Sequence, residues 1–128
     1  RLGLTERITL IPNILYLNYT ENKGGAWGIF HQYPILLIII SLFFFFFLLS
    51  YIRKQKTITK LESISYSLIL GGLLGNLFDR IFFGYVIDYI EVLIASYHFP
   101  IFNLADTFLV IGICLWIIEL IRGEKNEV

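Results

Sequence analysis

The chain has 128 residues, of which 57% are hydrophobic and only 16% are charged. A soluble domain carries about a quarter charged residues, so the composition argues against an ordinary soluble fold and predicts a protein that lies in the lipid bilayer. Ten acidic residues balance ten Lys and Arg. Phosphate binding needs a basic surplus, so this balance excludes a nucleic-acid partner. The single cysteine, Cys114, excludes an internal disulfide and a Cys-ligated zinc site.

The sequence begins at Arg1 and contains no methionine. We therefore expect that an N-terminal segment was removed or is not included. No signal peptide is visible in the residues given.

Three stretches are long and apolar enough to span a bilayer, which takes about 20 residues of helix. They are residues 34–52, 63 to about 82, and 102–121. The fold class predicted is therefore a mostly α, polytopic membrane protein with three transmembrane helices. The first helix carries five consecutive phenylalanines, residues 43–47, and we expect these to face lipid. The second contains Gly71 and Gly75, a spacing that predicts close contact with another helix.

The charges of the connecting segments predict the orientation. Arg53, Lys54, Lys56 and Lys60 lie between the first two helices, and by the positive-inside rule this loop and the C-terminal tail are cytoplasmic. Residues 1–33 and 83–101 then face outward. Residues 14–20 are rich in Tyr, Leu and Ile and precede a turn-like segment at 21–25, so we expect a small extracytoplasmic β-sheet there.

Acidic side chains at membrane depth are costly and are therefore candidates for function. Asp88 lies in the outward connection, residues 83–101, and Asp106 lies near the start of the third helix, which enters the membrane from that side. The predicted topology therefore places both acids at the outer leaflet. Two such carboxyl groups can share a proton and activate water, as in aspartic proteases. The alternatives are a purely structural role for Asp106 at a helix N-terminus and simple solvation at the interface for Asp88, which lies beside an aromatic residue. The adjacent charges Asp79 and Arg80, at the end of the second helix, favour a structural role.

Two further acids, Glu91 and Glu119, are expected to be solvated at the membrane interface. His31 and His98 have neither a Cys partner nor HExxH spacing, so we predict no metal site. No G-x-S-x-G motif is present, and the apolar spans contain no lysine that could activate a serine.

Four ordered blocks resemble the lipoprotein signal peptidase (signal peptidase II) family of bacterial membrane aspartic proteases. They are residues 22–28 (NKGGAWG), 72–80 (GLLGNLFDR), 86–89 (VIDY) and 102–106 (FNLAD). The resemblance spans residues 12 to about 120. In the first block, Gly25 and Trp27 replace the family's usual Ala and Phe.

The resemblance implies that Asp88 and Asp106 are the catalytic pair. It also implies residues that line or support the substrate site, namely Asn22, Gly24, Asn76, Asp79, Arg80, Asn103 and Ala105. The family has four spanning helices, so the chain, residues 1–128, is expected to be a single membrane-embedded peptidase domain that lacks the first of them.

The implied substrate is a prolipoprotein whose lipobox cysteine already bears diacylglycerol. It would be cut just before that cysteine, at the outer leaflet of the bacterial inner membrane, without a metal or an organic cofactor. The competing hypothesis is a non-catalytic membrane subunit, a transporter or assembly factor, whose acids bind protons or partner helices. A proton path would place acids through the membrane depth, whereas here Asp88 and Asp106 are predicted at one side.

Overall fold

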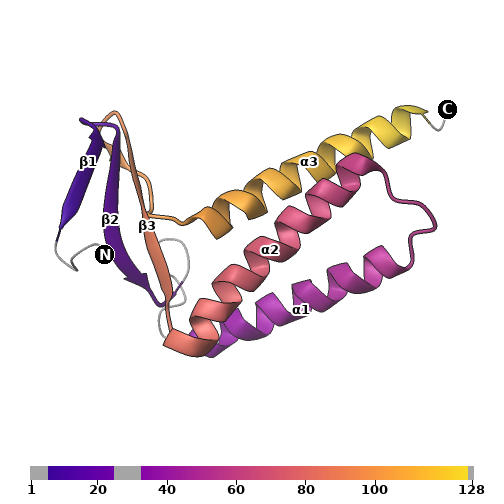
Figure 1. Cartoon of the computed structure of the whole chain (residues 1–128), viewed down its shortest axis with the longest axis horizontal. Coiled ribbons are helices and arrows are strands. Elements are labelled where there is room, and N and C mark those ends of the chain that lie inside the picture. Colours follow the sequence, from indigo (N-terminus) through magenta and orange to yellow (C-terminus); the bar gives the residue numbers. More distant parts are fainter. Residues whose placement is uncertain (1–5, 25–32, 127–128) are drawn as a thin grey trace. The chain divides into compact units, whose positions relative to one another are not determined.

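The computed structural model describes residues 6–24 and 33–126 (Figure 1). In chain order the elements are β1 (Arg7–Ile11), β2 (Leu15–Asn22), α1 (Pro34–Arg53), α2 (Lys60–Phe83), β3 (Val86–Ile94), β4 (Tyr97–His98) and α3 (Leu104–Asn126). The chain divides into two compact units. One comprises Arg1–Ile39 with Phe78–Asn103, and contains the strands; the other comprises Ile40–Leu77 with Leu104–Val128, and contains most of the helical residues.

The three helices are long and apolar enough to cross a membrane, which confirms the three predicted spans. The helix α2 begins at Lys60, three residues earlier than expected, because Thr59 caps it. The Thr59 hydroxyl accepts a hydrogen bond from the Glu62 N–H at 3.1 Å, and the Glu62 carboxylate accepts one from the Thr59 N–H at 3.4 Å. Such a reciprocal capping box satisfies two of the donors left free at a helix N-terminus.

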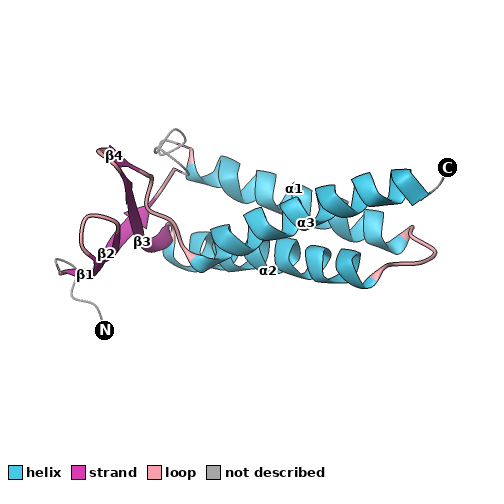
Figure 2. Cartoon of the chain, turned by 90° about the horizontal axis from the view of Figure 1, so that it is seen from above, coloured by secondary structure: helices cyan, strands magenta, loops and turns pink. Residues whose placement is uncertain are grey.

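The connection between α1 and α2 and the end of α3 lie at the same end of the three helices (Figure 2). This agrees with the prediction that both segments lie on one side of the membrane. Phe43, Phe44, Phe46 and Phe47 are more than half exposed, as expected for side chains that face lipid.

The helices α2 and α3 are joined through two matching rows of residues. Each row has the i, i+4, i+7, i+11 spacing that places side chains on one helix face. The rows are Ser65, Ile69, Gly72 and Asn76 on α2, and Ala105, Leu109, Gly112 and Trp116 on α3. A Cβ added at Gly72 would meet Ala105 and Leu109, and one added at Gly112 would meet Ser65 and Ile69. The two helices therefore approach as closely as their backbones allow.

The predicted glycine interface on α2 is confirmed, but of the two glycines predicted to form it, Gly71 and Gly75, only Gly75 does so. Gly75 faces Ala105, whereas Gly71 has no heavy atom within 4 Å of the place where its Cβ would be. Gly72 makes the closest approach instead, because it lies 100° further round the helix and in line with the contact row.

The end of the interface near the connection between α1 and α2 is aromatic. Tyr51 of α1, Tyr66 of α2 and Trp116 of α3 form three mutual edge contacts, with ring centroids 5.5–6.4 Å apart. Leu48, Tyr66 and Ile69 form the buried core beside them. These contacts tie all three helices together.

The strands form one antiparallel sheet in the order β1-β2-β3-β4 (Figure 1). This confirms the predicted small sheet, although the strand expected at 14–20 runs over Leu15–Asn22, and β1, β3 and β4 were not anticipated as strands. The pairing of β2 with β3 joins the two segments that were both predicted to face outward. The third helix starts at Leu104 rather than Phe102, because Phe102 forms a β-bridge with Ile90.

Candidate active site

Asp88 is the most deeply buried acid of the strand unit. It lies on β3, is only 2% exposed, and has an amide donor on each carboxylate oxygen. Asn22 Nδ2 donates to Oδ2 at 2.8 Å, and Asn103 Nδ2 donates to Oδ1 at 2.8 Å. Two such N–H donors stabilise the ionised form of a carboxyl group. A buried charge is tolerated only when it is paired in this way.

The local structure fixes both asparagines. Asn22 is the last residue of β2, and its backbone pairs with Val86. Its own side-chain oxygen accepts the N–H of Gly24 at 3.0 Å, which closes a tight turn and orients the amide nitrogen toward Asp88. Asn103 directly precedes α3, and its amide also donates to the Ile87 carbonyl at 3.3 Å. The two amides that bind Asp88 thus come from either side of it in the sequence, Asn22 before it and Asn103 after it.

Asp79 supports the same strand from α2. Its Oδ2 accepts a hydrogen bond from the backbone N–H of Ile87, the residue before Asp88, at 3.2 Å. The predicted structural role of Asp79 thus has a definite partner. Both Asp79 and Arg80 are half-buried, and they lie a turn inside α2 rather than at its end, which is Phe83.

Asp106 lies in the first turn of α3, within the helical unit. Its Oδ1 accepts a hydrogen bond from Asn76 Nδ2 of α2 at 2.8 Å, and Asn76 is buried. The neighbouring Ala105 provides the tight contact with α2, since its carbonyl oxygen is only 2.5 Å from where a Cβ on Gly72 would be. Close packing of α2 on α3 therefore sets the distance between Asn76 and Asp106.

The structure thus assigns contacts to most of the predicted site residues. Asn22, Gly24, Asp79 and Asn103 surround Asp88 or its strand, while Asn76 and Ala105 accompany Asp106. The two groups belong to different compact units. Gly25 and Trp27, the two departures from the family pattern, lie outside the described residues.

A surface tyrosine lies on β2 near Asn22. A side-chain hydrogen bond with Tyr85 raises the pKa of Tyr19 to about 12, with smaller contributions from desolvation and from the Glu21 carboxylate. The Tyr19 hydroxyl also donates to Glu21 at 3.3 Å. Tyr19 therefore remains neutral at any physiological pH.

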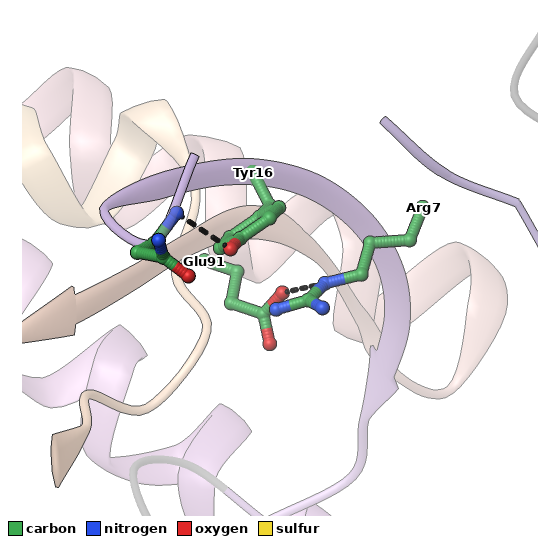
Figure 3. Close-up of polar contacts among 4 residues, drawn as sticks. Arg7, Tyr16 and Glu91 are labelled. Carbon is green, nitrogen blue, oxygen red and sulfur yellow. Dashed lines mark hydrogen bonds and ion pairs between the residues drawn. The ribbon is translucent and has the colours of Figure 1, made fainter. Parts of the chain in front are cut away.

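The expectation for Glu91 was wrong. Glu91 is 9% exposed rather than solvated, and its Oε1 accepts a hydrogen bond from Arg7 Nε at 2.6 Å (Figure 3). No local pattern near either residue predicts this pair, because 84 residues separate the partners. Glu119 is not solvated as expected either: its side chain is 15% exposed, against 11% for that of Glu91, and lies 3.7 Å from Arg122.

The chain is also similar to known proteins. A family model described as signal peptidase (SPase) II matches residues 2–122. The chain belongs to the signal peptidase II family. Signal peptidase II enzymes are aspartic peptidases, so this chain is an enzyme of lipoprotein processing and a multi-pass membrane protein.

Two solved structures are similar to this signal peptidase II family member. One is a bacterial membrane enzyme determined by the in meso method at 2.3 Å resolution, with a TM-score of 0.89 and 33% identity, covering 99% of this chain and 77% of that one. The other, determined by the same method at 1.9 Å, has a TM-score of 0.81 and 34% identity, covering 93% of this chain and 77% of that one. The family assignment does not favour the alternative of a non-catalytic membrane subunit.

Proposed function

We propose that Asp88 and Asp106 are the catalytic carboxyl groups of this signal peptidase II. The observation that carries the proposal is the burial of Asp88 with an amide donor on each carboxylate oxygen. The two donors hold this buried carboxylate in one orientation, which a catalytic group requires. Asp106 is likewise oriented by a buried amide, that of Asn76.

The chain itself supports a joint role for the two acids. Asn103, which binds Asp88, lies three residues before Asp106, and a chain of three residues spans at most about 11 Å. Asn76, which binds Asp106, lies three residues before Asp79, which binds the strand of Asp88; both are on α2, where three residues rise about 4.5 Å. Asp88 is therefore held by a residue three positions from Asp106, and Asp106 is held by a residue three positions from Asp79, which binds the strand of Asp88.

The proposed chemistry is general acid–base hydrolysis by a carboxyl pair that shares one proton. The ionised member removes a proton from water, which attacks the scissile carbonyl carbon. The protonated member donates its proton as the peptide C–N bond breaks. The amide donors of Asn22, Asn103 and Asn76 hold the two carboxyl groups in place and stabilise negative charge on them.

The substrate that we propose is a prolipoprotein whose cysteine already carries diacylglycerol, cut on the N-terminal side of that cysteine. An acylated cysteine is anchored at the membrane surface by its lipid chains. The site would then lie at the outer leaflet of the bacterial inner membrane. The positive-inside rule supports this side, because it predicts that the cation-rich loop from Arg53 to Lys60 is cytoplasmic.

The catalytic assignment is tested by cleavage of a lipid-modified prolipoprotein with Asp88→Asn, Asp106→Asn and the double variant, each in the full chain and with membrane insertion confirmed. We expect each single variant to lose about 10²- to 10⁴-fold in turnover, and the double variant to lose little more, because the pair acts as a unit. Glu6→Gln, at an exposed acid, is the matched control and should cleave normally. Near-normal turnover by either single variant would refute the pair.

The orientation is tested by cysteine labelling in a Cys114→Ser background. An impermeant thiol reagent should label Tyr97→Cys in intact cells and should leave Lys56→Cys unlabelled until the membrane is opened. The reverse pattern would place the strand unit in the cytoplasm and would contradict the proposed side of cleavage.

A further inference from the structure

Arg7, Tyr16 and Glu91 tie three strands together beside the strand segment that carries Asp88 (Figure 3). Arg7 is on β1, Tyr16 on β2 and Glu91 on β3, and Tyr16 lies directly opposite Glu91 in the sheet. The Arg7 guanidinium carbon lies 3.6 Å from the centre of the Tyr16 ring, while its Nε donates to Glu91 at 2.6 Å. The Tyr16 hydroxyl accepts the Asn13 N–H at 2.8 Å, which fixes the ring.

The sheet is irregular between this cluster and Asp88. Leu17 pairs with Ile90 but Thr20 pairs with Asp88, so β2 contains one residue more than β3 in this interval. On the other side of β3, the N–H groups of Tyr89 and Ile90 both donate to the carbonyl oxygen of Phe102, at 2.9 and 2.8 Å. Such bulges change the direction of side chains and are frequent beside active sites.

A bulge leaves the register of the strands weakly defined unless other contacts fix it. A slip by one residue would turn each side chain of β3 to the opposite face. Asp88 would then lose Asn22, which binds it across the β2–β3 pair. The backbone of Arg7 pairs with Asn18, inside the bulged interval, and its side chain reaches Glu91 beyond that interval. The side chain of Arg7 thus bridges the irregular part of the sheet.

We propose that Arg7 and Glu91, held against Tyr16, are positioning residues that fix the bulge register and thereby the place of the Asp88 carboxylate. The pair is suited to this role because Glu91 is nearly buried while Arg7 is 43% exposed at its side chain. A carboxylate buried without its partner is strongly disfavoured. The planar guanidinium can bind Glu91 and stack on Tyr16 at once, which an ammonium group does less well. The proposal rests on Asp88 being catalytic.

Kinetics of prolipoprotein cleavage test the role in the reaction. Arg7→Ala and Glu91→Ala should lower kcat by about 10- to 100-fold, the loss expected for a misplaced catalytic group, with KM little changed, since neither side chain is assigned to substrate. Arg7→Lys should retain part of the activity, and the exchanged pair Arg7→Glu with Glu91→Arg should recover more than either single variant. Glu6→Gln is the matched control. Wild-type kcat in folded Arg7→Ala enzyme would overturn the proposal.

Disulfide trapping tests the register without any catalysis. In a Cys114→Ser background, Glu21→Cys and Ile87→Cys oppose each other in the native register and should crosslink on oxidation. Adding Arg7→Ala should reduce this crosslink and increase that of the shifted pair Glu21→Cys with Val86→Cys. Unchanged crosslinking would overturn the proposal whatever the activity.

The two readouts also separate this inference from the catalytic assignment. If Asp88→Asn kept its turnover while Arg7→Ala altered the crosslink, the pair would still set the strand register but the catalytic role of Asp88 would be wrong. If Asp88→Asn lost turnover while Arg7→Ala altered neither kcat nor the crosslink, the catalytic role of Asp88 would be supported. The positioning role of Arg7 and Glu91 would then be refuted.

Discussion

Gly72 offers the sharpest test of how helix packing supports the Asp106 group. A methyl group added there would lie 2.5 Å from the carbonyl oxygen of Ala105 and 2.6 Å from Leu109 Cγ. The Leu109 side chain can rotate, but the Ala105 oxygen belongs to the backbone of α3. To reach ordinary contact at 3.4 Å, α3 would have to retreat locally by about 0.9 Å. Overpacking of this kind costs about 1–3 kcal/mol.

This displacement of α3 would also move Asp106. Asp106 follows Ala105, and Asn76 is one turn beyond Gly72, so the 2.8 Å hydrogen bond between Asn76 and Asp106 must stretch as α3 moves. A shift of about 1 Å in a catalytic group can cost 10²-fold in rate. We therefore expect Gly72→Ala to lower both the unfolding temperature and the rate of prolipoprotein cleavage.

The assay compares Gly72→Ala with Gly71→Ala in thermal unfolding and in cleavage. Gly71 is the matched control, since a methyl group there meets nothing within 4 Å and alanine is the better helix former by about 0.5–1 kcal/mol. Gly71→Ala should be neutral or stabilising and fully active. Equal stability and equal activity of the two variants would refute the argument that this face of α2 sets the position of α3.

Three further outcomes follow from individual contacts. Ser65→Ala removes the 2.7 Å hydrogen bond from the Ser65 hydroxyl to the Gly112 carbonyl and should cost about 0.6 kcal/mol of unfolding free energy, the average for such bonds in membranes, with cleavage retained; a loss above roughly 2 kcal/mol would imply a wider role. Asn76→Ala removes the amide that orients Asp106 and should reduce kcat by about tenfold or more at unchanged insertion, whereas an unchanged kcat would remove Asn76 from the site. Because the pKa of Tyr19 is raised to about 12, ultraviolet difference absorbance between the wild type and Tyr19→Phe should show no phenolate from this residue near pH 10, the ordinary tyrosine value, and its appearance there would contradict the hydrogen bonding described.

Hydrophobic length was sufficient to predict the helices, and local motifs singled out the two acids that we propose as catalytic. The three spans are each set by some 20 apolar residues, a signal contained within one segment, and α2 differed from prediction mainly because the Thr59 capping box extends it. Asp88 and Asp106 were selected because each lies in a distinctive local motif, and their catalytic role stays a prediction. The signals were strong because each one is local.

The contacts between distant segments could not be predicted in the same way. Nothing near Glu91 indicates that Arg7 will neutralise it, and a glutamate beside a membrane is ordinarily solvated. Similarly, both Gly71 and Gly72 fit a small-residue interface, and only the angular position of the α3 contact row decides between them. Strand pairing and helix rotation depend on the whole fold, so side chains that act across them are visible only in the structure.

The pairing of β2 with β3 has a consequence for biogenesis. Asn22 and Asp88 are 66 residues apart, and both α1 and α2 lie between them in the chain. Asn103 follows Asp88 by another 15 residues. Contacts of such long sequence separation form late, because the intervening chain must be ordered first. Asn22 is therefore synthesised before both helices and Asp88 after them, so the first amide contact must wait for α1 and α2, and the second must wait until synthesis has reached Asn103 at the start of α3.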